Sequence, residues 1–479
     1  MDDTQEPTLP KRVIKISPLE EPLRLRLMIS HGKTGRYATL SHCWGPPEMS
    51  PLTTTSHNFE AHLKAIDWAK LPKTFQDTVH VTRQLGLTYL WIDSICIIQD
   101  DTEDWLTESA KMGTVYERSE VTIAASHSVH SWQGLFLNRS SQSPPIPLPN
   151  FDPRSKDLCI YAEAFLKDYA AIQPESGPLA KRAWATQEWL LARRMIFYCR
   201  DRILWSCQTI TQEETGEKRY NTARNPKWKI ITEHYSERQL TKATDRLVAL
   251  NGLVSELSKR LNDSYILGLW KNALPDQLLW QVSQQVKEPS NPLQLPSWTW
   301  ASVPVGIRYM IIKNAKNHCR QIDTSVSGSI TITARLKRIY DLRDGGDHRL
   351  NGLYPGICGA VGGDVYASNA KNTPRMFSYV VDRDNAECGW AVLDHSISSD
   401  ASLPPLYALA LMGSLTRKAS EQDYTVPSGA QSSSKIQEYW ILLLEAQDLA
   451  THTFTRVGVG KVYGQEYWKD SAVQRVTLV

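Results

Sequence analysis

A carboxylate, Glu108, falls within the apolar stripe of a segment with helical spacing. In the segment Asp104–Glu120, Trp105, Met112 and Tyr116 share one face of a helix, and Glu108 lies on that face between Trp105 and Met112. Burial disfavours the charged form of a carboxyl group, and a carboxylate in a cleft can do acid–base or electrostatic work. The alternative is a helix shifted in register, with Glu108 exposed or paired with an arginine.

A second candidate group is the stretch Ser41-His42-Cys43-Trp44-Gly45. Activation of Cys43 by His42 would make a thiol nucleophile, but neighbouring residues of a strand point to opposite faces. A buried cysteine that serves only as a small apolar residue is the alternative. The chain has no HExxH motif and no Cys/His cluster at ligand spacing, so we predict no metal site. It also has no phosphate-cradling glycine loop.

Asp93 and Arg182 are the remaining charged candidates. Asp93 lies near the end of an apolar run, where α/β proteins often place ligand-binding residues; capping a helix or pairing with Arg182 is the alternative. Arg182 can hold a phosphate or carboxylate through two parallel hydrogen bonds, or it can form an ion pair that fixes its segment to the sheet. Trp44 is either a core residue or a ligand-stacking residue.

Alternating strands and helices position these candidates. We expect strands at Tyr37–Ser41, Leu87–Ile98 and Glu120–Ser126, separated by helices at Leu71–Gly86 and from Asp101 or Thr102 onward. This alternation is typical of an open α/β sheet, and the apolar run Leu87–Ile98 is typical of a strand buried on both faces. Such sheets bind ligands beyond the carboxyl ends of their strands.

Length and composition limit the class of protein. A chain of 479 residues is too long for one core, and a net charge of +3 gives no reason to expect nucleic acid as a partner. No segment approaches the ~20 apolar residues of a membrane span. The eight cysteines form no CxxC pair and the N-terminus resembles no signal peptide, so we expect a cytoplasmic protein with reduced thiols.

Three blocks of sequence resemble the fungal heterokaryon-incompatibility (HET) domain. They are YATLSHCWG, the long block from LPKTFQDTVHV to EVTIAAS, and RAWATQEWLLARRMIFY, and together they cover about residues 35–205. The resemblance implies nonself recognition, regulated cell death and a remote relation to TIR domains, which are flavodoxin-like α/β sheets. Many TIR domains cleave NAD at the nicotinamide–ribose bond with a glutamate in a W-x-x-E pattern, which Trp105-Leu106-Thr107-Glu108 has here.

The resemblance implies that Glu108 is the catalytic residue of an NAD glycohydrolase. Its carboxylate would stabilise the oxocarbenium-like charge that develops on the ribose, and Arg182 would meet the pyrophosphate. NAD would be the substrate, with no cofactor and no metal. The expected substrate-binding residues are Ser41, Trp44, Gly45, Asp93, Cys96, Gln99, Trp105, Arg182 and Gln187.

The expected fold is a flavodoxin/TIR-like open, mainly parallel sheet with helices, then a helical region and a β-rich C-terminal domain. The expected boundaries are a leader at 1–34, the HET domain at 35–205, a helical region packed on it at 206–290 and the β-rich domain at 291–479. We expect a homo-oligomer or association with a sensor protein. Two other functions stay open: a non-enzymatic self-associating signalling module, and an enzyme that acts on another small molecule.

Overall fold

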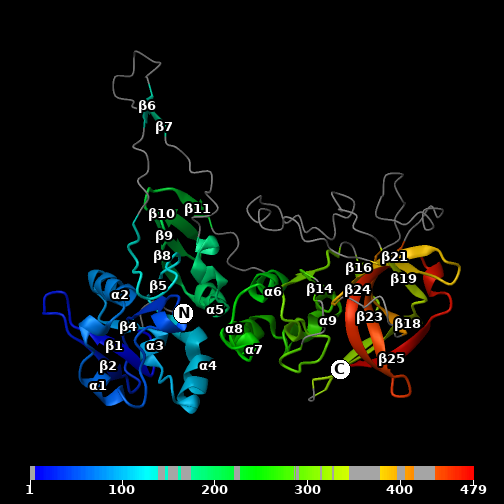
Figure 1. Ribbon diagram of the computed structural model, residues 1–479, viewed down its shortest axis with the longest axis horizontal. Helices are drawn as coiled ribbons and strands as arrows, with labels where there is room; N and C mark the ends of the chain where they lie inside the picture. The colour runs from blue at the N-terminus through cyan, green and yellow to red at the C-terminus, as the bar shows by residue number, and fades with distance from the viewer. Residues whose placement is uncertain are drawn as a thin grey trace. The chain divides into compact units, whose positions relative to one another are not determined.

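The computed structural model divides into two compact units (Figure 1). Unit 1 comprises Met1–Pro226, Arg238–Leu240 and Val248–Glu256, and unit 2 comprises Lys227–Glu237, Thr241–Leu247 and Leu257–Val479. The structure describes residues 6–138, 146–148, 160–162, 174–220, 227–284, 286, 291–312, 315–325, 328–344, 378–395, 405–414 and 437–479. None of the helices in these ranges is both long and apolar enough to cross a membrane.

Unit 1 is built on a nine-stranded sheet in the order β11-β10-β9-β8-β5-β3-β4-β1-β2. The four central strands β4, β3, β5 and β8 are parallel, whereas the pairs on both sides of them are antiparallel. The sheet is therefore mixed, and the expectation of a mainly parallel sheet is wrong. The strands are β1 (Arg12–Ile16), β2 (Leu25–Ile29), β3 (Ala38–Ser41), β4 (Tyr89–Trp91), β5 (Val121–Ala124), β8 (Arg194–Tyr198), β9 (Ile203–Cys207), β10 (Ile210–Glu213) and β11 (Lys218–Tyr220).

Helices connect the parallel strands, as the alternating pattern predicts. They are α2 (Lys73–Gln84), α4 (Thr102–Arg118) and α5 (Ala185–Leu191), and Figure 1 shows α2 and α4 on opposite sides of the strands. The predicted start of α4 is confirmed, because the Asp101 carboxylate caps it by accepting from the backbone N–H groups of Glu103 and Asp104. The shorter elements are α1 (Phe59–Lys64), α3 (Asp93–Cys96), β6 (Ile146–Leu148) and β7 (Ile160–Ala162).

Two segments differ from their expected form. The run Leu87–Ile98 contains one short strand, β4, which is followed by the helical turn α3 from Asp93 to Cys96. Residues 12–29, expected within a leader with one short extended piece at 23–29, form two strands, β1 and β2, which pair with each other and extend the sheet beyond β4.

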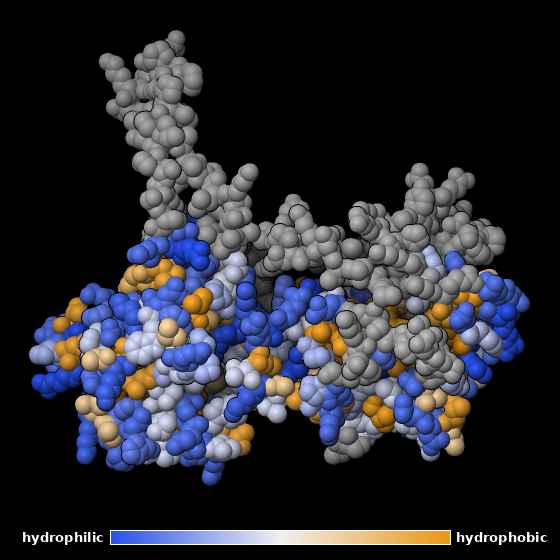
Figure 2. All heavy atoms as spheres, viewed as in Figure 1, coloured by the Kyte–Doolittle hydropathy of each residue, from blue (hydrophilic) through white to orange (hydrophobic). Residues whose placement is uncertain are grey.

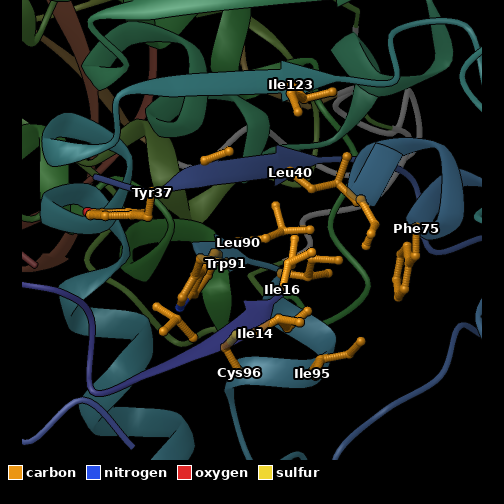
Figure 3. Packing of buried hydrophobic residues seen from close by; sticks show 14 of the residues in the cluster. Ile14, Ile16, Tyr37, Leu40, Phe75, Leu90, Trp91, Ile95, Cys96 and Ile123 are labelled. Atoms are coloured by element: carbon orange, nitrogen blue, oxygen red, sulfur yellow. The ribbon is translucent and has the colours of Figure 1, made fainter. Parts of the chain in front are cut away.

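The core of unit 1 lies between the sheet and its helices (Figure 3). Figure 3 shows Leu40 of β3 and Leu90 of β4 packed near Ile14 of β1, with Phe75 of α2 alongside. These side chains are at most 2% exposed, so the strands that carry the candidate residues are firmly held at their centres.

Unit 2 has helices near its start and a β-rich remainder, as expected. Between residues 227 and 284 lie α6 (Trp228–Ser236), α7 (Asp245–Val248), α8 (Asn251–Leu261), which begins in unit 1, and α9 (Leu274–Gln277). Two short antiparallel strand pairs accompany these helices: β12 (Tyr265–Ile266) with β13 (Leu269–Trp270), and β14 (Trp280–Val282) with β15 (Ile307–Tyr309).

A ten-stranded sheet makes up the rest of unit 2, and part of it closes on itself. Each member of the series β18, β22, β23, β24 and β25 pairs with the next, and β25 pairs with β18. Closure leaves no free edge within this ring. The strands are β16 (Ala315–Asn317), β17 (Gln321–Thr324), β18 (Ile330–Arg338), β19 (Asp341–Asp344), β20 (Ser378–Val381), β21 (Glu387–Leu393), β22 (Leu406–Ser414), β23 (Glu438–Asp448), β24 (Thr453–Tyr463) and β25 (Ala472–Leu478).

Candidate functional site

The chain segments that follow β3 and β4 are tied together at the carboxyl ends of these strands. Trp44 comes three residues after the end of β3, and its indole N–H donates to the Asp93 carboxylate at 2.9 Å. The other carboxylate oxygen of Asp93 accepts the Ser94 N–H at 2.7 Å. Asp93, the first residue of α3, therefore orients the Trp44 ring at this edge of the sheet.

A third segment, which contains Arg182 and α5, reaches the same edge. The Arg182 guanidinium donates to the His42 carbonyl oxygen, and the Ser41 hydroxyl donates to the Glu188 carboxylate. Ser41 is the last residue of β3 and lies beside Ala124 of β5. We call the six residues Ser41, His42, Trp44, Asp93, Arg182 and Glu188 the β3-edge cluster.

Burial and charge perturb the ionisation of the β3-edge cluster. Burial raises the pKa of Glu188 to about 7, against the opposing influence of Arg182 and of the Ser41 hydroxyl. Burial lowers the pKa of His42 to about 4 although its Nδ1 lies 3.9 Å from the Asp93 carboxylate, so His42 is neutral at pH 7. Burial also opposes the charge on Arg182, but Glu188 and Asp93 outweigh it and raise the pKa of the guanidinium.

The cluster has an outer and an inner part. Trp44, Asp93 and Arg182 are half-buried, whereas Ser41, His42 and Glu188 are buried. The three outer residues each keep part of their surface exposed to solvent.

Glu108 is buried on α4, as the helical stripe indicates. Its carboxylate accepts from Lys111 Nζ at 3.1 Å, and the Lys111 side chain is 55% exposed, so Glu108 is joined to the surface through a lysine rather than an arginine. One turn earlier Asp104 pairs with Arg12 and Lys11. Among the residues that the structure describes, no hydrogen bond or ion pair links Glu108 to the β3-edge cluster.

The other predicted substrate-binding residues lie in varied surroundings. Gln99 donates to the carbonyl oxygens of Asp93 and Ile97, each at 3.1 Å, and Gly45 is an exposed turn residue with a φ of +96°. Cys96 lies in the core, where burial raises the pKa of its thiol to about 12. Their roles stay predictions.

Trp105 and Gln187 flank the contact between α4 and α5. The half-buried Trp105 ring meets the Trp184 ring edge-to-face at 6.4 Å between centroids. Gln187 is fully buried, and in the described part of the chain neither of its amide atoms has a hydrogen-bond partner. Both residues also stay predictions as ligand contacts.

Sequence reasoning did not include Glu188 or Tyr116 among the site residues. Tyr116 donates to the Leu40 carbonyl oxygen at 3.0 Å, and its hydroxyl also faces Glu188. The available signal was the segment between Arg182 and Glu188, Ala-Trp-Ala-Thr-Gln, most of whose residues are small or aromatic and favour burial. Within the described ranges no three His, Cys, Asp or Glu side chains gather to hold a metal ion.

The sequence of this region matches a known protein family. Residues 37–188 match the family described as Heterokaryon incompatibility protein (HET), and this range contains the whole β3-edge cluster. Residues 37–188 therefore form a HET domain, a domain implicated in fungal heterokaryon incompatibility. Comparisons with curated proteins and with solved structures give no match.

Proposed function

We propose that this HET-domain protein hydrolyses the nicotinamide–ribose bond of NAD and acts through this reaction in nonself recognition and regulated cell death. The observation that carries the proposal is the placement of Trp44, Asp93 and Arg182, half-buried, at the carboxyl ends of parallel strands. Open α/β sheets bind ligands at this edge.

The order of the parallel strands supports a TIR-like arrangement. Numbered along the chain, β3, β4, β5 and β8 lie in the order 2-1-3-4, with which flavodoxin-like sheets also begin. In such sheets the ligand lies where the strand order reverses, here beside the ends of β3 and β5. Ser41 and Ala124 are register partners at that point.

The outer side chains of the β3-edge cluster match the parts of a dinucleotide. Arg182 offers a fixed cation to the pyrophosphate, because its guanidinium is already oriented by the His42 carbonyl oxygen. Asp93 retains unused lone pairs that can accept from a ribose hydroxyl. The Trp44 ring, oriented by Asp93, offers a face for a base or for nicotinamide.

The reaction needs one carboxylate near the anomeric carbon of the ribose. The C–N bond breaks, its electron pair leaves with neutral nicotinamide, and the carboxylate stabilises the positive charge that remains on the ribose. A water oxygen then bonds to the anomeric carbon and releases a proton. We propose Glu108 for this role, since it is a buried carboxylate on the helix that follows β4.

The test is nicotinamide release from NAD by the purified full-length chain at high concentration, with a crowding agent to promote assembly. We expect Glu108→Gln to lower the rate at least about 100-fold, because one charge-stabilising group commonly contributes that much. The exposed Glu103 lies on the same helix, and Glu103→Gln should leave the rate unchanged.

Each result has a distinct meaning. Loss of release in Asp93→Asn but not in Glu108→Gln would transfer the role of the carboxylate to the β3-edge cluster and keep the reaction. Absence of nicotinamide release from the wild-type chain under these conditions would contradict the proposed reaction itself.

A non-enzymatic, self-associating module is the second candidate, and one segment favours it. Val129, Trp132 and Phe136, in the loop after β5, are 52%, 43% and 60% exposed. Figure 2 shows hydrophobic residues in separate patches on a mostly hydrophilic face. Exposed aromatic side chains often mark interfaces. If this loop drives association, Phe136→Ser will lower the sedimentation coefficient at high concentration, and an unchanged coefficient would argue against it.

A further inference from the structure

We infer that Glu188 is a positioning residue that takes up a proton when a phosphate-bearing ligand binds to Arg182. The inference rests on the proposed function for the nature of the ligand, and it adds a residue and a pH dependence to that site. The β3-edge cluster is thereby assigned as a proton-coupled anion site.

The geometry isolates Glu188 from solvent and couples it to Arg182. Glu188 is 2% exposed, and its carboxylate accepts from the Ser41 hydroxyl, which is 1% exposed. Arg182 is its strongest electrostatic partner and belongs to the half-buried outer part of the cluster. An anion that binds Arg182 therefore approaches a buried carboxylate that water cannot screen.

The charge and exposure of the groups around Glu188 favour Glu188 as the group that accepts the proton. Asp93 is a second carboxylate facing Arg182, and it is partly accessible to solvent, with a side chain 14% exposed. The Tyr116 hydroxyl and the Cys43 thiol face the same charges, and burial raises the pKa of both, so they stay neutral. His42 is neutral, as described above. Arg238 is a second cation that acts on Glu188.

The charge balance changes when an anion arrives. In the free protein the Arg182 cation offsets part of the charge of Glu188 and Asp93. A phosphate on Arg182 adds negative charge beside Glu188 and competes for the same cation. Protonation of Glu188 by solvent removes one charge and restores the balance, so the bound state holds more protons than the free state.

Binding and proton uptake can be measured together by calorimetry. The probe is ADP-ribose, which carries a pyrophosphate and lacks the bond that the proposed reaction breaks. Titrations at pH 8 in two buffers of different ionisation enthalpy give the number of protons taken up. We expect the uptake of about one proton per site. We also expect the affinity for ADP-ribose to fall by up to about tenfold per pH unit above pH 7.

Three controls identify the proton acceptor. Glu188→Gln keeps the shape and the Ser41 contact, so it should bind ADP-ribose with no proton uptake and with pH-independent affinity. Glu103→Gln should behave as the wild type, and adenosine, which has no phosphate, should bind without proton uptake. Circular dichroism of Glu188→Gln checks its fold.

Two results with the wild type would overturn the inference: no binding of ADP-ribose, or binding of ADP-ribose without proton uptake. Proton uptake that persists in Glu188→Gln would also overturn it, because the proton would then belong to another group such as His42. These outcomes are separable from the fate of the proposed function. Nicotinamide release without proton-coupled binding would reject only the inference, whereas proton-coupled binding without release would reject only the reaction.

Discussion

Glu188 combines a buried position with a group that is charged in water. Taking a carboxylate out of water is unfavourable unless a cation and hydrogen bonds compensate it. Here Arg182 and the Ser41 hydroxyl compensate only in part, which leaves the pKa of Glu188 at about 7. A group that titrates near neutrality in the middle of a ligand-accessible cluster is a typical property of functional sites.

The raised pKa of Glu188 has a consequence for stability. Between the ordinary pKa of 4.5 and about 7 the folded chain holds a proton that the unfolded chain releases, so stability falls as pH rises through this window. The loss attributable to Glu188 is about 3 kcal/mol. We expect urea unfolding of Glu188→Gln to lack this part of the fall, while Glu103→Gln keeps it. Parallel pH profiles for wild type and Glu188→Gln would contradict the assignment.

Unit 2 also contains a buried charged residue, Arg456. Its guanidinium lies 3.3 Å from the Trp280 ring centroid and pairs with the Asp394 carboxylate. Arg456→Met should cost about 3–5 kcal/mol of unfolding free energy, because it leaves Asp394 buried without its cation. The double variant Arg456→Met/Asp394→Leu should recover part of this loss in the same denaturant titration. A single variant within about 1 kcal/mol of wild type would show that Asp394 needs no partner.

At the level of single elements, α4 was largely predictable, whereas the contacts between elements far apart in the sequence were not. The cap at Asp101 and the stripe of Trp105, Met112 and Tyr116 are local patterns, and the helix follows them. Glu188 reaches Ser41 across 147 positions of the chain, and no local pattern specifies such a distance. The end of β4 was not predicted either, since the run Leu87–Ile98 has strand composition throughout but turns into the helix α3 at Asp93.

The contact of α4 with α8 gives a prediction for one glycine. A Cβ added at Gly113 would lie 2.5 Å from the Gly252 Cα and 3.0 Å from Leu191 Cδ1. Gly113→Ala should therefore destabilise the chain by about 1–3 kcal/mol despite the better helix propensity of alanine. Exposed Thr114 is the matched site, and Thr114→Ala should change stability by less than about 0.5 kcal/mol in thermal unfolding. Stabilisation by Gly113→Ala would contradict the close approach.

For the whole molecule, the broad class of each region was predictable from pattern. The α/β N-terminal region, the helical middle and the β-rich end all follow from periodicity. Periodicity does not predict which distant segments pair. It therefore did not predict the pairing of β1 with β4 or the closure of the C-terminal ring through β18 and β25. The proposed domain boundaries stay a prediction, and the two units share the region from 227 to 261.

This interleaving predicts how fragments behave. Gln239 belongs to unit 1, where its N–H donates to the Lys181 carbonyl oxygen at 2.6 Å and its carbonyl accepts from Ala183 at 3.0 Å. A fragment that ends at residue 226 loses these contacts and Gly252, whereas one that ends at 256 keeps them. We expect the shorter fragment to unfold at a temperature lower by roughly 5–15 °C in a thermal scan. Equal melting temperatures would show that the segments beyond 226 do not stabilise unit 1.

The most direct test of the proposed NAD hydrolysis is to incubate NAD with the chain and to measure nicotinamide and ADP-ribose by chromatography. We expect the wild type to form both products in equal amounts, and Glu108→Gln to form them at a rate at least about 100-fold lower. An intact NAD pool after prolonged incubation of the assembled wild-type chain would contradict the proposed hydrolysis.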